Sequence, residues 1–241
     1  MKTDLYIPRS YRASCRGGAT VNFTVGVGQS DLFISADRDL TGITLLYLSL
    51  LYKDIRSYID EGFMTSLKPL KAADHAPMII KKMVDASQIF NVGPMAAVAG
   101  AISEEVAQYL CLYSKQVIVE NGGDIFVVNN NTTIVSLCFN LVDAMNEISF
   151  ELGPCPSGMG ICTSSGVIGH SLSFGNADAV TVICQTGYLA DAAATALCNL
   201  IQDDDDIEKA IEYARGFKEI LGVIIIMGGK IGIFGEVIKI V

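Results

Sequence analysis

Residues 151–195 read ELGPCPSGMGICTSSGVIGHSLSFGNADAVTVICQTGYLADAAAT, and the rest of the chain is organised around this stretch. Its first half crowds together glycines, small hydroxyl residues, two cysteines and one of the two histidines. An apolar, strand-like run at 179–184 follows, and then a small-residue helix carrying Asp191 and Thr195. A glycine- and serine-rich segment buries little and costs backbone entropy to order. We therefore interpret the first half as a functional loop.

The composition indicates a well-filled core without a membrane span. The 241 residues suffice for a sizeable core, and we expect a single domain over 1–241. Apolar residues make up 51%, but the weakly polar runs 43–52, 92–102 and 220–227 are shorter than the roughly 18 residues of a span. We ascribe the apolar excess to a thick core plus a homodimer interface. The amino-terminal residues lack an apolar signal segment, which predicts a cytoplasmic protein.

Charge and cysteine usage exclude further classes of function. The formal net charge is −9 and basic residues are scattered, so nucleic acid is not an expected partner. The seven cysteines form no CxxC pair and no zinc-finger spacing with histidine. In a chain of this size they are expected to be reduced thiols, without a disulfide framework or a structural zinc site.

Hydrophobic patterning predicts an α+β protein, with mixed or antiparallel sheets packed against helices. Apolar runs predict strands at 19–27, 31–35, 116–120, 125–128, 134–139, 147–152 and 179–184, with a closing hairpin that turns at Gly228-Gly229. Helical periodicity predicts helices at 40–59 (ended by Gly62), from Pro77, after 91–94, at 188–200 and at 207–215.

Two motifs can carry chemistry, and each also has a plain structural explanation. The turn 121–124, Asn-Gly-Gly-Asp, has one glycine more than a hairpin requires, which exposes backbone N–H groups beside the carboxylate of Asp124. Asp191 and Thr195 lie four residues apart on one helix face and can supply two oxygens to a hard cation. Such pairs are also common without a metal. The acidic run 203–206 is better explained as the start of a helix.

Other catalytic signatures are missing from the sequence. It contains no P-loop, no GxGxxG after a strand, no HExxH and no GxSxG. Ser164 or Ser165 with His170 matches no reliable hydrolase arrangement. The small-residue helix after 91–94 allows either tight helix packing or the close approach of a flat ligand.

Three patches in a fixed order resemble the ApbE family. They are the small-residue helix after 91–94, the ENGGDI turn at 120–125, and TSSGxxGHS at 163–171 followed by ADAAATAL at 190–197. Members of that family are flavin transferases, which use FAD and a divalent metal to attach FMN through a phosphoester to a Thr or Ser of a flavoprotein subunit. The resemblance implies an ApbE-like fold, a nucleotide-type ligand and a protein partner.

The resemblance also implies roles for individual residues. Asp191 and Thr195, with a backbone carbonyl near Ala96, correspond to the ligands of the divalent metal, expected to be Mg²⁺. Asp191, His170 and Cys162 become the candidate catalytic residues. The residues that correspond to the FAD or FMN site are Asn121, Gly122, Gly123, Asp124, Thr163, Ser164, Ser165, Gly166 and His170.

The form CTSSGxxGHSxSFGxADAVTV, residues 162–182, is more similar still to a short cytoplasmic ApbE-like family of methanogenic archaea and anaerobic bacteria. That resemblance extends over almost the whole chain. The smaller family has been linked to homocysteine synthesis and sulfur assimilation, which implies an alternative function in which Cys162 or Cys155 relays sulfur. In that alternative, loop donors and His170 lower the pKa of the thiol.

The sequence also departs from the transferase pattern. GPMAAVAG at 93–100 lacks the lysine that transferases carry ahead of the helix, which removes a charge expected near the phosphates. The Asp-Pro run that follows the family's histidine is replaced by SLSFG after His170. A third alternative is therefore a non-catalytic, homodimeric structural protein that keeps the fold.

Overall fold

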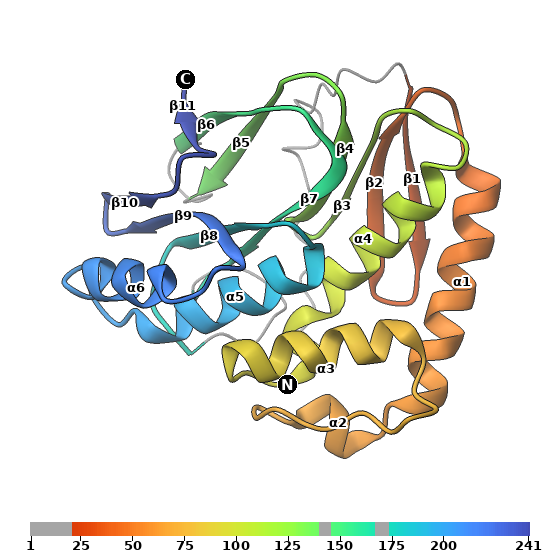
Figure 1. Cartoon of the computed structure of the whole chain (residues 1–241), viewed down its shortest axis with the longest axis horizontal. Helices are drawn as coiled ribbons and strands as arrows, with labels where there is room; N and C mark the ends of the chain where they lie inside the picture. Colours follow the sequence, from red (N-terminus) through yellow and green to blue (C-terminus); the bar gives the residue numbers. More distant parts are fainter. Residues whose placement is uncertain (1–20, 140–145, 167–173) are drawn as a thin grey trace.

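A computed structural model describes residues 21–139, 146–166 and 174–241. An eight-stranded antiparallel sheet in the order β1-β2-β3-β4-β7-β8-β9-β10 crosses the molecule (Figure 1). Its strands are β1 (Val21–Val27), β2 (Ser30–Ala36), β3 (Val117–Asn121), β4 (Asp124–Asn129), β7 (Cys155–Ser164), β8 (Ala179–Cys184), β9 (Ile220–Met227) and β10 (Lys230–Phe234). A second sheet has the order β11-β6-β5 and contains β5 (Thr133–Phe139), β6 (Asn146–Leu152) and β11 (Lys239–Ile240).

The helices cover one face of the large sheet, and the small sheet covers part of the other (Figure 1). The helices are α1 (Thr41–Tyr58), α2 (Glu61–Thr65), α3 (Met78–Phe90), the 3₁₀ turn η2 (Pro94–Ala97), α4 (Val98–Leu110), α5 (Gly187–Leu200) and α6 (Asp206–Arg215). One apolar core lies between helices and sheet, and a second lies between the two sheets. Because both faces of β8 are covered, all six of its residues are buried. The α+β prediction is confirmed.

Local sequence signals explain where the early helices end. α1 ends at Tyr58, so the prediction that Gly62 ends this helix is wrong. Gly62 lies inside the short helix α2, which starts because the carboxylate of Asp60 accepts a hydrogen bond of 2.7 Å from the N–H of Phe63. α3 ends at Phe90 and is capped by Asn91, whose φ of 55° is left-handed, as the predicted break at 91–94 requires.

The largest correction concerns the glycine- and serine-rich segment, which is not a loop over Cys155–Ser164 but the ten-residue strand β7 in the middle of the large sheet. Its glycines serve close packing. A Cβ on Gly158 would lie 2.4 Å from the ring of Phe126, and one on Gly160 would lie 2.5 Å from the carbonyl oxygen of Thr186. Glycine inside a strand marks such close approaches. The composition that predicts a loop therefore reflects packing beneath α5.

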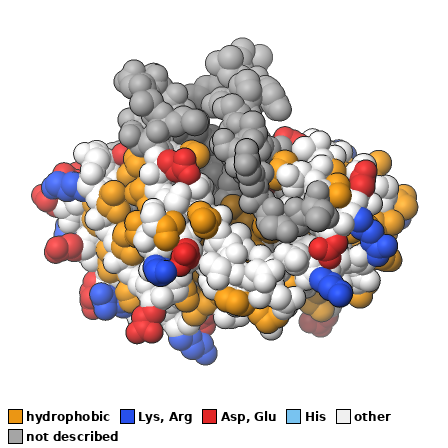
Figure 2. Space-filling model, turned by 90° about the horizontal axis from the view of Figure 1, so that it is seen from above, with side chains coloured by type: hydrophobic (Ala, Val, Ile, Leu, Met, Phe, Trp, Pro, Cys, Tyr) orange, Lys and Arg blue, Asp and Glu red, His pale blue; other side chains and the backbone are white. Residues whose placement is uncertain are grey.

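The end of the chain ties the two sheets together. The predicted hairpin at Gly228-Gly229 is confirmed, and both glycines have positive φ. After β10 the chain leaves the large sheet, and β11 pairs with β6 of the small sheet. No helix within the described ranges is long and apolar enough to cross a bilayer. On the coloured part of the face in Figure 2, basic side chains are scattered among acidic and apolar ones.

Candidate functional site

The candidate site lies where α4 and α5 begin, next to the β3–β4 turn and the end of β7. The N–H of Gly100 in α4 donates a 2.8 Å hydrogen bond to Oδ2 of Asp191 in α5. The N–H of Thr163 at the end of β7 donates to Oδ1 of Asp124 at 3.3 Å. Ser103 of α4 donates through its hydroxyl to the backbone carbonyl of Asp124 at 2.9 Å. The three patches of the sequence therefore meet in space.

Asp191 serves as the N-terminal cap of a helix to which it does not belong. α4 has Ala97 at its N-cap and no side-chain cap of its own, so the first-turn N–H groups need an acceptor. Burial raises the pKa of the Asp191 carboxyl to about 7, against the lowering effect of hydrogen bonds from the backbone of Gly100 and Ala99. Asp191 is thus a carboxyl that titrates near neutral pH in the metal-free protein.

Asp124 is a second acid beside Asp191. Burial is the main reason why its pKa is raised well above the usual range, and the negative charge of Asp191 raises it further. The Thr163 N–H and the Cys162 thiol hydrogen-bond to it and partly offset this rise. Two carboxyls in one low-dielectric site repel each other when both are ionised. Within the described ranges, no Lys or Arg forms an ion pair with either of them.

The oxygen atoms around this acidic pair fit a hard divalent cation. Thr195 is buried one turn after Asp191 on the same face of α5. Ser164 is also buried, and among the described residues its hydroxyl has no hydrogen-bond partner. Strand alternation places Ser164 on the same face of β7 as Cys162, which packs in the core beneath α5. Carboxylate, hydroxyl and carbonyl oxygens are the ligands that Mg²⁺ takes.

The raised pKa values predict an unusual pH dependence of stability for the metal-free protein. A carboxyl with a folded pKa of about 7 and an unfolded pKa of about 4 binds its proton more tightly in the folded state. Its contribution to stability is therefore full below about pH 4 and is lost as pH rises towards 7. In EDTA, urea unfolding should give a lower free energy of unfolding at about pH 8 than at about pH 5.

The matched variant for this pH experiment is Asp191→Asn, which cannot ionise. We expect it to reduce the loss of stability between the two pH values and to be at least as stable as the wild type at the higher one. Identical pH profiles for the two proteins would contradict the assignment of this titration to Asp191.

Cys162 does not have the environment that sulfur relay requires. Its side chain is fully buried, and its thiol lies 3.5 Å from the carbonyl oxygen of Gly187. Burial, followed by the charges of Asp124 and Asp191, raises its pKa well above the ordinary value. Burial raises the pKa of Cys155 as well. The expectation of a lowered thiol pKa is therefore wrong for both cysteines, because burial raises both pKa values and the two carboxylates raise that of Cys162 further.

This environment predicts that Cys162 is inert towards alkylating reagents in the folded protein. Iodoacetamide followed by peptide mass spectrometry should label Cys138, which is exposed, and leave Cys162 unmodified. In urea both residues should react, which provides the internal control. Labelling of Cys162 in the native protein at a rate comparable with Cys138 would show that its thiol is accessible and would restore the relay hypothesis.

Most of the other predicted site residues lie close by, but several of their polar groups are already engaged. The N–H of Gly123 donates to Glu120 at 2.8 Å, so the prediction that the extra glycine presents a free N–H is wrong at this position. The hydroxyl of Thr163 shares a 2.8 Å hydrogen bond with that of Thr181, so only its N–H reaches Asp124. The amide of Asn121 is buried and donates to Ser30.

The remaining predicted site residues are Gly122, Ser165, Gly166, Ala96 and His170. Gly122 forms the β3–β4 turn with a φ of 71°. Ser165 and Gly166 follow β7, where the N–H of Gly166 donates to the carbonyl of Ala177. Ala96 lies in η2, directly ahead of α4. His170 lies outside the described residues.

The acidic run 203–206 behaves as expected. α6 begins at Asp206, and the side chains of Asp204 and Asp206 pair with Lys230 at 2.7 Å and Lys209 at 2.8 Å. Asp203, Asp204 and Asp205 are the one group of three or more potential ligands found together in the described part of the chain. The ion pairs of Asp204 and Asp206 with lysines, together with the start of α6 at Asp206, support the structural explanation of the run.

Sequence reasoning missed Glu104 and Lys82. Glu104 is buried in α4 and accepts a 2.7 Å hydrogen bond from the N–H of Gly187, the first residue of α5. Lys82 of α3 forms an ion pair with it at 2.9 Å. The signal was available, because a Ser-Glu-Glu run interrupts an otherwise small and apolar helix.

Comparison with known proteins places this chain in a family. Residues 12–232 match the family model described as "AbpE bacteria". A UPF0280 protein of Methanocaldococcus jannaschii is 41% identical over 184 residues, covering 74% of this chain and 75% of that protein. A UPF0280 protein of Methanopyrus kandleri is 38% identical over 226 residues, covering 90% and 91%.

Solved structures of low sequence identity share the fold. The flavin transferase ApbE from Vibrio cholerae has a TM-score of 0.64 at 13% identity and covers 90% of this chain and 97% of its own. The ApbE protein from Thermotoga maritima has a TM-score of 0.61 at 10% identity, with the same coverage. The predicted ApbE-like fold is confirmed.

Proposed function

This chain belongs to the AbpE bacteria family, and from that premise we propose that it binds a flavin nucleotide together with a divalent cation and transfers FMN to a hydroxyl group of a protein. The main observation that supports this proposal is the pair of acids Asp124 and Asp191, which lie together without a basic partner among the described residues. A bound cation relieves their repulsion, and it also neutralises the pyrophosphate of a nucleotide.

In this proposal the ligands come from elements that are already in place. Asp191 and Thr195 of α5, with a backbone carbonyl near Ala96, would hold Mg²⁺. When bound, the ion supplies charge neutralisation at the phosphates. The chain itself orients Asp191, because Gly100 donates to one of its carboxylate oxygens, Oδ2, at 2.8 Å. In this proposal the other carboxylate oxygen would bind the cation.

The missing lysine makes the proposed site depend more strongly on the cation. GPMAAVAG at 93–100, which runs through η2 into the first turn of α4, offers only apolar side chains. Lys82, from α3, is held between Glu104 and Glu105 at 2.9 and 2.8 Å and is not available to a phosphate without breaking both ion pairs. We therefore expect nucleotide affinity to be low in EDTA and to rise steeply when Mg²⁺ is added.

A thermal-shift titration of metal-stripped protein with FAD, FMN or ADP, each with and without Mg²⁺, tests the proposal. A ligand that binds only the folded state stabilises it by about 2.7 kcal/mol at a hundredfold excess over its dissociation constant. We expect a shift with FAD that requires Mg²⁺. ADP with Mg²⁺ reports the pyrophosphate contribution without the flavin. No shift with any nucleotide would overturn the proposal.

Transfer itself is tested separately by incubating the protein with FAD, Mg²⁺ and candidate acceptor proteins and measuring flavin that remains attached after denaturation. A sulfur-relay function is not proposed as a second candidate, because the pKa values of Cys162 and Cys155 are both raised.

A further inference from the structure

α4 and α5 cap each other. α4 has no side-chain cap of its own, and Asp191 of α5 accepts from the N–H of Gly100 in its first turn. α5 has Thr186 at its N-cap, but the Thr186 hydroxyl makes no capping bond. Glu104 of α4 accepts from the N–H of Gly187 instead, at 2.7 Å. Each helix thus supplies the carboxylate that the N-terminus of the other requires.

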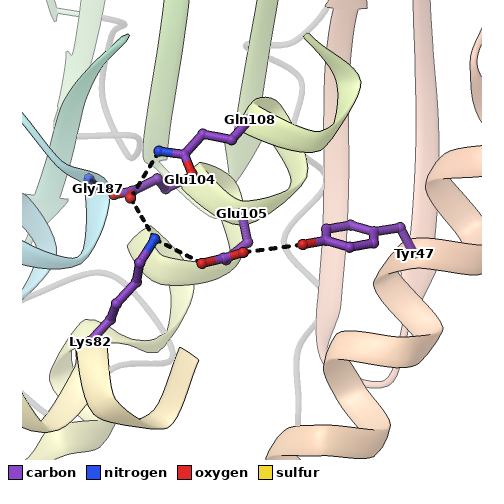
Figure 3. Close-up of polar contacts among 6 residues, drawn as sticks. All are labelled: Tyr47, Lys82, Glu104, Glu105, Gln108 and Gly187. Atoms are coloured by element: carbon purple, nitrogen blue, oxygen red, sulfur yellow. Dashed lines mark hydrogen bonds and ion pairs between the residues drawn. The ribbon is translucent and has the colours of Figure 1, made fainter. Parts of the chain in front are cut away.

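Glu104 is itself held in place from two further directions. As Figure 3 shows, its carboxylate accepts hydrogen bonds from the side chains of Lys82 and Gln108, in addition to the one from the N–H of Gly187. The distances from its Oε1 are 2.9 Å to Nζ of Lys82 and 3.2 Å to Nε2 of Gln108. Lys82 offsets only part of the charge of Glu104, because it also pairs with Glu105. The contact of Glu104 with α5 is made through the backbone N–H of Gly187.

Glu105 provides a natural comparison. It binds the same Lys82, at 2.8 Å, and accepts a hydrogen bond from the hydroxyl of Tyr47 at 3.1 Å (Figure 3). In Figure 3 its carboxylate lies between the amine of Lys82 and the hydroxyl of Tyr47. Glu104 and Glu105 thus share a cation, but in these contacts only Glu104 reaches the backbone of α5.

The crossing of the two helices leaves no room for adjustment at this point. A Cβ on Gly187 would lie 2.4 Å from the carbonyl oxygen of Gly100. A helix moves as a rigid rod over one turn, so a displacement at Gly187 is passed on to Asp191, four residues later. The Glu104–Gly187 hydrogen bond and the Asp191–Gly100 hydrogen bond therefore hold α5 against α4 at two points one helical turn apart.

We propose that Glu104 is a positioning residue, which holds the start of α5 so that the Asp191 carboxylate points correctly towards a divalent cation. This inference rests on the cation site of the proposed function. Residues that orient a metal ligand from outside the coordination shell change metal affinity about 10- to 100-fold when they are removed. Glu104 acts indirectly, because it contacts the backbone N–H of Gly187 in α5 and not the side chain of Asp191.

The test compares Glu104→Gln with Glu105→Gln, the same chemical change at neighbouring residues that share Lys82. Isothermal titration of metal-stripped protein with Mg²⁺ should show affinity about 10-fold weaker for Glu104→Gln, since a neutral amide holds Gly187 less strongly, and unchanged for Glu105→Gln. Glu104→Ala should weaken binding more. If Glu104→Ala does not fold, the two glutamine variants still decide the question.

A second readout does not depend on the metal. Hydrogen exchange of the Gly100 amide, followed by ¹⁵N NMR, should accelerate in Glu104→Gln and stay as in the wild type in Glu105→Gln. Equal Mg²⁺ affinity in the two folded variants would overturn the positioning role. Wild-type protein that shows no Asp191-dependent Mg²⁺ binding would instead overturn the proposed function, so the two failures are distinguishable.

Discussion

Asp191→Asn should abolish the Mg²⁺-dependent stabilisation by FAD while leaving the metal-free protein at least as stable as the wild type near pH 8. The substitution preserves the size of the side chain and an oxygen that can accept from the N–H of Gly100. It removes the charge that a hard cation needs. Mg²⁺ affinity should fall by at least about 100-fold, beyond what the loss of an outer-shell contact gives.

The opposite signs of the two effects make this prediction specific. A variant that merely damages the fold loses ligand binding and stability together. Here the wild-type carboxyl is destabilising when ionised, since burial raises its pKa to about 7, and asparagine removes that cost. Thermal shift with and without FAD and Mg²⁺, combined with urea unfolding in EDTA, measures both quantities on the same samples.

Two further variants locate the cation. Thr195→Val removes a buried hydroxyl with little change of shape, and it should weaken the Mg²⁺ effect less than Asp191→Asn does. Asp205→Asn changes the exposed acidic cluster near the start of α6 and should have no effect. A wild-type Mg²⁺ response in Asp191→Asn, or its loss in Asp205→Asn, would move the cation away from the proposed site.

Periodic elements could be predicted from the sequence because their signals are local. The helical periodicity of α1, the break at 91–94 and the acidic start of α6 all depend on neighbouring residues. The apolar residues Leu45, Leu46 and Leu50 of α1 are nevertheless exposed, so its apolar pattern did not predict its buried face. The order of the three patches that resemble the ApbE family also predicted a shared site. Asp124, Thr163 and Asp191 do meet at the start of α4.

Features that depend on distant partners could not be predicted. β7 has the composition of a loop, because its glycines allow close packing against Phe126 and against the backbone at the start of α5. Neither of these partners is adjacent to β7 in sequence. The pairing of β11 with β6 joins residues 88 positions apart, such as Lys239 and Glu151. The capping role of Glu104 likewise requires that α5 begin beside α4.

Gly100→Ala should strongly destabilise the protein. A Cβ at this position would lie 2.2 Å from the carbonyl oxygen of Gly187 and 2.7 Å from Cβ of Asp191. Neither neighbour can yield cheaply, since one is backbone and the other is held by the capping bond to Gly100 itself. The helices must separate, and we expect a loss of about 3 kcal/mol or more in the free energy of unfolding.

Gly42→Ala is the matched control, because Gly42 also lies in the first turn of a helix, α1, where a Cβ would meet nothing within 4 Å. There the change should raise stability by up to about 1 kcal/mol, as alanine favours the helix.

For a chain of this length the melting temperature of Gly100→Ala should fall by roughly 6–12 °C. Similar melting temperatures for the two variants would mean that α4 and α5 can move apart freely, and then neither Asp191 nor Glu104 is held by the crossing. A large fall for Gly100→Ala alone, with Mg²⁺ binding lost in the fraction that remains folded, is what rigid mutual capping requires.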